Sequence, residues 1–169
     1  MSQHPCTDPQ HHVHDAQGFV AAVERACRER GLRLTPIRAR VLDLVARHGK
    51  PIKAYDLLDQ IRLDKQRVDD EDGAGAAAPP TVYRALEFLL VNGFIHKLES
   101  VNAFVACHHP STAQHSVPFL ICDHCHSAVE LEDERIVALL DEKARALGFV
   151  PQAQTLEVHG ICARCAQAG

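Results

Sequence analysis

The sequence lacks several features that would assign it to common classes of protein. No apolar run approaches the roughly 18 residues that a membrane-spanning helix needs. Residues 1–15 have neither the basic segment nor the apolar segment of a secretory signal. An H-E-x-x-H motif is also missing, so no motif supplies the ligands and general base of a zinc hydrolase. We therefore expect a cytoplasmic protein that is neither a membrane protein nor an enzyme.

An overall excess of basic charge is lacking too. The net charge of -4 argues against indiscriminate binding to nucleic acid. The charges are unevenly distributed, however. Residues 18–62 contain ten Lys or Arg against five Asp or Glu, whereas residues 100–169 contain four against eight. This asymmetry predicts an N-terminal module that contacts phosphates and an acidic C-terminal module with another role.

Cysteine and histidine are abundant, with seven and twelve residues. In a reducing cytosol, cysteines are metal ligands or reactive thiols more often than disulfides. Four of them form two C-x-x-C motifs, Cys122 with Cys125 and Cys162 with Cys165. Each motif places two thiolates on one tight turn, and two such turns complete a closed tetrahedral zinc site. A thioredoxin-like redox motif, the alternative, needs a single C-x-x-C that opens a helix. We therefore predict a structural zinc ion.

Apolar periodicity predicts four helices in the N-terminal half, followed by two strands. The expected helices cover residues 17–30, 35–48, 54–63 and 81–91, and the expected strands cover 94–99 and 103–107. Cys27 falls on the inward stripe of its helix and is expected in the core. Tyr55 can face inward on the third helix.

This order of elements is typical of a winged helix-turn-helix. The fourth helix carries an exposed Tyr83-Arg84 pair and would enter the major groove of DNA, where Arg can bond guanine. Other basic side chains would contact phosphates. A winged helix that binds another protein is the alternative.

The C-terminal part is predicted to be a small α/β unit. Strands are expected at 117–122, 127–131 and 154–159, with a helix from 132 to 147. The chain is thus expected to be an α+β protein. Its expected divisions are a flexible His-rich tail (1–16), a winged-helix DNA-binding domain (17–99) with an acidic and Ala-rich loop (64–80), a wing strand and hinge (100–116), and a zinc-binding domain (117–169).

A second possible metal site has no short motif. His96, Cys107, His115 and Glu130 form a mixed nitrogen, sulfur and oxygen set that suits zinc. Because these residues come from both modules, a metal bound to them would hold one module against the other. Cys107 could instead be a core residue and His115 a solvated one. Other histidines compete for the role, namely His108, His109, His124, His126 and His159.

Several motifs between about residue 17 and residue 165 resemble the ferric uptake regulator superfamily, and specifically its zinc uptake regulator branch. The matching segments are Leu32-Arg33-Leu34-Thr35-Pro36-x-Arg38, Ala54-Tyr55-Asp56-Leu57-Leu58, Pro80-Thr81-Val82-Tyr83-Arg84-Ala85-Leu86, Gly93-Phe94-Ile95-His96-Lys97, Cys107-His108, Ile121-Cys122-Asp123-x-Cys125 and His159-Gly160-x-Cys162-x-x-Cys165. The sequence departs from the pattern at Ile37, where Gln is frequent, in the long loop at 64–78 and in the His-rich tail.

The resemblance implies a homodimer joined through its C-terminal domains and two zinc ions per monomer. One is a structural zinc on Cys122, Cys125, Cys162 and Cys165, and the other is a regulatory zinc on His96, Cys107, His115 and Glu130. The implied DNA-binding residues are Tyr83, Arg84, Tyr55, Thr81, Arg33 and Arg38. Asp59 and Arg62 are placed where adjacent dimers would touch on DNA.

The function that we predict is zinc-dependent repression of transcription at an inverted-repeat operator. The resemblance implies zinc-uptake genes as targets. Sensing of iron or manganese within the same superfamily is one alternative, although the thiolate of Cys107 favours zinc. A second alternative is that the protein also activates some promoters. A third is a zinc-stabilised module that never contacts DNA.

Overall fold

The computed structural model describes residues 15–65, 78–108, 110, 117–131, 133–151 and 155–168. The described residues fall into two compact units, one within residues 12–114 and one within residues 115–169. The predicted His-rich tail and most of the acidic and Ala-rich loop lie outside the described residues. None of the helices in the described ranges has the length and apolar content of a membrane span.

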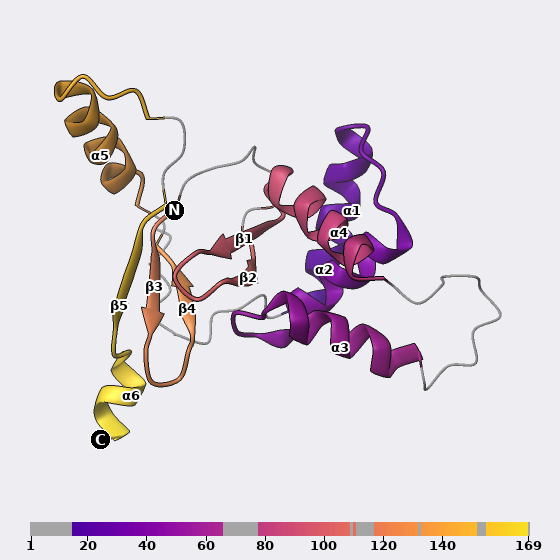
Figure 1. Cartoon of the computed structure of the whole chain (residues 1–169). Helices are drawn as coiled ribbons and strands as arrows, with labels where there is room; N and C mark the ends of the chain where they lie inside the picture. The colour runs from indigo at the N-terminus through magenta and orange to yellow at the C-terminus, as the bar shows by residue number, and fades with distance from the viewer. Residues whose placement is uncertain are drawn as a thin grey trace. The chain divides into compact units, whose positions relative to one another are not determined.

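Four helices form the body of the N-terminal unit (Figure 1). They are α1 (Ala16–Glu29), α2 (Pro36–His48), α3 (Ala54–Lys65) and α4 (Pro79–Val91). α2 packs against α1, α3 and α4, and all four contribute to one apolar core. Val23, Leu42, Leu57 and Leu86 are among its fully buried side chains, as expected for apolar stripes at helical spacing. The four predicted helices are thus confirmed, and Cys27 is buried among them.

The position of Tyr55 differs from the inward position that the sequence suggested, because Tyr55 faces outward and is 75% exposed. The inward positions of α3 are Leu57, Leu58 and Ile61, all buried. These positions are separated by one and three residues and so lie on one helical face, whereas Tyr55 lies two residues before that face begins. The Tyr55 ring was therefore assigned to the wrong side of α3.

Glycines end the first two helices. Gly31 and Gly49 have φ of +65° and +68°, a conformation that glycine adopts without strain. After α1 the Leu32 N–H donates to the Cys27 carbonyl at 2.8 Å, which closes the last turn. Thr35 stands at the predicted N-cap of α2 with extended backbone, but its side chain makes no capping hydrogen bond.

The start of α4 also differs from the prediction, since it begins at Pro79, two residues before Thr81. Proline at the first helical positions has a suitable φ, and the N–H group that it lacks would have had no partner within the helix. The Pro79-Pro80 pair therefore starts the helix rather than ending the loop before it.

The wing consists of β1 (Ile95–Leu98) and β2 (Ala103–Ala106), paired antiparallel with Ile95 opposite Ala106. A turn with Asn102 at φ +48° joins them. Ile52, just before α3, adds a short bridge to this pair, because its backbone exchanges hydrogen bonds of 3.0 and 2.8 Å with Phe104. The N-terminal unit is therefore a winged helix-turn-helix, as predicted.

The C-terminal unit is a small α/β unit, also as predicted. Its elements are β3 (Phe119–Cys122), β4 (Ala128–Glu130), α5 (Glu134–Ala146), β5 (Glu157–Gly160) and α6 (Ala163–Ala168). β3 is central, with β4 antiparallel on one side and β5 parallel on the other (Figure 1). The short helix α6 was not predicted.

Helix α5 is well capped but poorly covered. The Asp133 side chain accepts a hydrogen bond from the Arg135 N–H at 3.0 Å, and Gly148 follows the helix with φ +77°. None of its residues is buried, and Leu139 and Leu140 on the predicted apolar face are about half exposed. The apolar face of α5 thus has no complete cover among the described residues of the single chain.

Candidate metal centres and nucleic-acid interface

The two C-x-x-C motifs meet in the C-terminal unit. The Sγ atoms of Cys122, Cys125, Cys162 and Cys165 all lie within 4.8 Å of one another. The parallel pairing of β3 with β5 brings this about, because it sets Cys122, the last residue of β3, beside Gly160, two residues before Cys162. A spacing of 37 residues between Cys125 and Cys162 thereby becomes an Sγ–Sγ distance of 3.8 Å.

This donor set fits a zinc ion. Zinc bound by four thiolates at about 2.3 Å requires tetrahedral sulfur–sulfur edges of about 3.8 Å, which is the distance between Cys125 and Cys162. With four protein thiolates, no position stays open for water or substrate, and such a site is structural. The predicted four-cysteine cluster is therefore present.

The surroundings of Cys122, Cys125 and Cys165 shift the pKa values of their thiols. A hydrogen bond from the Ser127 hydroxyl is the main cause that lowers the pKa of Cys125 to about 5. The Cys125 backbone N–H lowers the pKa of Cys122, whereas interaction with the Cys162 side chain raises that of Cys165 to about 12. Four thiolates this close repel one another, so complete ionisation requires a cation among them.

Further contacts surround this cluster, and the sequence motifs did not indicate them. The Ser127 Oγ lies 3.1 Å from the Cys125 Sγ, and the Cys162 N–H donates to the Cys122 Sγ at 3.3 Å. His159 and Asp123 contact each other through Nδ1 and Oδ1 at 2.9 Å, which links β5 to the first C-x-x-C turn. The C-x-x-C pattern specifies only the cysteines, so a search for ligand spacing does not find Ser127, Asp123 or His159.

Two of the four residues predicted for the second metal site lie close together in the N-terminal unit. His96 is on β1 and Cys107 directly follows β2, and their ligand atoms lie within 4.8 Å of one another. The pairing of β1 with β2 and a 3.1 Å hydrogen bond from the Cys107 N–H to the Phe94 carbonyl determine this approach. Cys107 is fully buried.

The other two predicted ligands belong to the C-terminal unit. Glu130 is the last residue of β4 and is buried there. His115 lies outside the described residues. Of the competing histidines, His124, His126 and His159 are all exposed. The four-ligand second site thus stays a prediction.

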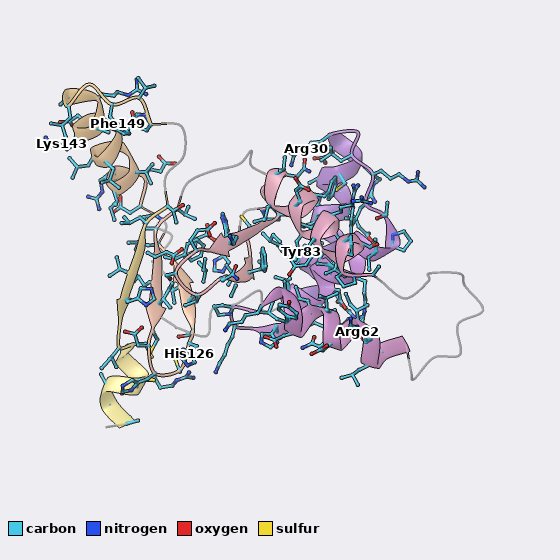
Figure 2. All side chains as sticks on the ribbon, in the orientation of Figure 1. Arg30, Arg62, Tyr83, His126, Lys143 and Phe149 are labelled. Carbon is cyan, nitrogen blue, oxygen red and sulfur yellow. The ribbon has the colours of Figure 1, made fainter. Side chains whose placement is uncertain are left out.

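The residues predicted to read DNA lie on exposed faces of α4 and α3. Tyr83, Arg84 and Thr81 are exposed on α4, while Val82, Ala85 and Leu86 point into the core. Figure 2 labels Tyr83 on this helix. Tyr55 is exposed near the start of α3. Because the inner face of α4 is fixed by packing, the outer face presents its polar side chains on a rigid support.

The two arginines predicted to contact DNA before and within α2 have different surroundings. Arg33 is exposed, whereas Arg38 is half-buried with its guanidinium 3.7 Å from the centroid of the Phe88 ring on α4. Arg38 also donates to the Arg33 carbonyl at 2.6 Å. The guanidinium of Arg38 therefore links α2 to the helix that carries Tyr83 and Arg84.

Asp59 and Arg62 form an exposed pair on α3, with 3.4 Å between the Arg62 Nη1 and the Asp59 Oδ1 (Arg62 is labelled in Figure 2). This i,i+3 contact lies within one chain, on one face of the helix. Their role between adjacent dimers stays a prediction.

Comparison with known proteins gives consistent results. The ferric uptake regulator family matches residues 29–159. The zinc uptake regulation protein of Escherichia coli (strain K12) is 39% identical over 151 residues, which cover 89% of this chain and 83% of that protein. The crystal structure of holo XcZur is 69% identical with a TM-score of 0.78, covering 89% of this chain and 98% of that one. A zinc uptake regulator complexed with zinc and DNA is 38% identical with a TM-score of 0.80, covering 90% and 96%.

Proposed function

The chain belongs to the ferric uptake regulator family, and we propose that it is a zinc-responsive transcriptional repressor that binds inverted-repeat operator DNA as a dimer. The observation that carries this proposal is the similarity, across 90% of the chain, to a zinc uptake regulator complexed with zinc and DNA. Genes of zinc uptake are the expected targets, as the names of the relatives indicate.

We assign two zinc ions to each monomer. The four cysteines hold the structural ion, whose donor set and 3.8 Å sulfur–sulfur distance suit zinc. His96, Cys107, His115 and Glu130 hold the regulatory ion. The close pair of His96 and Cys107 supports this assignment, since imidazole and thiolate together favour zinc over iron or manganese.

The residues of the regulatory site connect ligand binding to DNA binding. His96 and Cys107 belong to the winged-helix unit, and His115 and Glu130 belong to the unit that would form the dimer. When all four bind one ion, the winged helices of the two monomers are held at the separation of operator half-sites. A zinc ion at this site would be bound by two imidazoles, one thiolate and one carboxylate.

On the DNA, Tyr83 and Arg84 read bases in the major groove, and Arg33, Arg38, Thr81 and Tyr55 orient each winged helix on the backbone. Arg84 is suited to a bidentate contact with guanine. We propose a cytoplasmic regulator rather than an enzyme. The four-cysteine site itself would leave no position for a reacting water.

The experiment measures zinc per monomer before and after a mild chelator, together with affinity for an inverted-repeat duplex. We expect two zinc ions to fall to one, with DNA binding lost on removal and restored by added zinc. Unchanged affinity between zinc-loaded protein and protein stripped of the regulatory ion would refute the proposal. A zinc-stabilised winged helix without a sensing role would then be the better description.

A further inference from the structure

The four cysteines of the cluster are held in place in different ways. Cys122 ends β3, and its sulfur accepts the Cys162 N–H at 3.3 Å. Cys162 lies between β5 and α6, and Cys165 lies within α6. Cys125 lies in the turn between β3 and β4, where neither strand nor helix fixes its backbone. Cys125, like Cys162, thus lies outside the strands and helices, and a side-chain contact can orient it.

Ser127 supplies such a contact. Its side chain is 2% exposed, and its Oγ lies 3.1 Å from the Cys125 Sγ. Its carbonyl accepts the Cys122 N–H at 2.9 Å, so one residue bonds both cysteines of the motif. His126, which lies between Cys125 and Ser127, has φ of +58° (His126 is labelled in Figure 2). This conformation turns the chain so that Ser127 comes back toward Cys125.

A buried hydroxyl needs a hydrogen-bond partner, and a thiolate can only accept. We propose that Ser127 is a positioning residue of the four-cysteine zinc site, where its hydroxyl donates to the Cys125 thiolate and keeps zinc from dissociating. The inference rests on the proposed function in one respect, namely that the four cysteines hold zinc.

Two physical effects follow from this hydrogen bond. It restricts the rotamer of Cys125 to the one that points at the other three sulfurs, which lowers the entropy lost when zinc binds. It also withdraws charge from the sulfur, so a thiolate held in this way would be less readily captured by an electrophile. Loss of a partner of this kind typically costs about 10- to 100-fold in metal affinity.

Two matched pairs of proteins separate the hydroxyl from the space that it occupies. Wild type and Ser127→Ala form the first pair, and Ser127→Thr and Ser127→Val form the second. Thr and Val have the same shape and differ in the hydroxyl. Ser100→Ala is the control, since Ser100 is exposed and lies in the other unit. All variants are made in the full-length protein, and the chelator-labile zinc is removed first.

The readouts are the rate at which the remaining zinc passes to a chromogenic chelator, and the thiolate-to-metal charge-transfer band of the cobalt(II)-substituted protein. We expect Ser127→Ala and Ser127→Val to release zinc about tenfold faster than wild type and to shift the band. Ser127→Thr and Ser100→Ala should match wild type.

Equal release from the Thr and Val variants would overturn the role of the hydroxyl, because shape alone would then explain any change. Equal release from wild type and Ser127→Ala would overturn it as well. Either result would leave the proposed function intact, since wild type would still hold its zinc. A wild-type protein with no zinc on the four cysteines would overturn both.

Discussion

At the scale of single residues, Arg84 is the side chain on which recognition of DNA should depend most. It is exposed on α4, whose opposite face is fixed in the core. We expect Arg84→Ala to weaken operator binding by about 1–3 kcal/mol and to relax sequence preference, while zinc content stays unchanged. Titration of operator and scrambled duplexes measures both effects. Equal loss on both duplexes would mean that Arg84 contacts phosphate only.

Cys107 tests the division between the two metal sites. We expect Cys107→Ser to retain the structural zinc and the fold, but to lose the regulatory zinc and with it zinc-dependent DNA binding. Because Cys107 is fully buried, a hydroxyl there should cost about 1–3 kcal/mol of stability. Metal analysis, circular dichroism and duplex titration check the three expectations. An unfolded variant would show that Cys107 is a structural residue.

At the scale of elements, the contact between α2 and α4 distinguishes two arginines. Arg38 lies over Phe88, whereas Arg33 is exposed. Arg38→Ala should lower the free energy of unfolding by about 0.5–2 kcal/mol through the lost cation–π contact. Arg33→Ala should leave stability unchanged and reduce the slope of log affinity against log salt by about 1. Thermal unfolding measures the effect on stability, and DNA titration at several salt concentrations measures the contact with phosphates. If the two variants behaved identically in both measurements, the distinction between Arg38 and Arg33 would be wrong.

Helix α5 should contribute to the dimer interface. Its half-exposed Leu139 and Leu140 gain cover when a second copy packs there. Burial of one Leu side chain stabilises by about 1.5–3 kcal/mol, so Leu139→Glu should weaken the dimer by about 10- to 100-fold. Ala138→Glu adds the same charge on the opposite, exposed side of α5 and is the matched control. Sedimentation analysis measures both, and an equal effect of the two variants would place the interface elsewhere.

At the scale of the whole molecule, zinc and operator DNA should be linked. If the regulatory zinc raises operator affinity by some factor, operator DNA must raise the affinity of that zinc by the same factor. Competition for zinc against a chelator, with and without duplex, measures the second factor. Unequal factors would show that a further equilibrium, such as contact between adjacent dimers through Asp59 and Arg62, takes part.

Patterns that depend on neighbours along the chain were predicted well. The helices of the winged-helix unit follow from apolar positions at helical spacing, and the ends of α1 and α2 follow from Gly31 and Gly49. The four clustered cysteines follow from two C-x-x-C turns. These features are local, because a helix face or a turn is determined by residues within one or two turns of one another.

Contacts between distant segments were decided by the tertiary structure. The outward direction of Tyr55 depends on which face of α3 meets the core, and the approach of Cys125 to Cys162 depends on the parallel pairing of β3 with β5. The contact of Asp123 with His159 arises from the same strand pairing, whereas the contact of Ser127 with Cys125 is local and depends on the turn at His126. The sequence by itself determined which side chains are able to bind zinc and DNA. Which of them meet was determined by strand pairing and core packing, since those interactions join residues far apart in the chain.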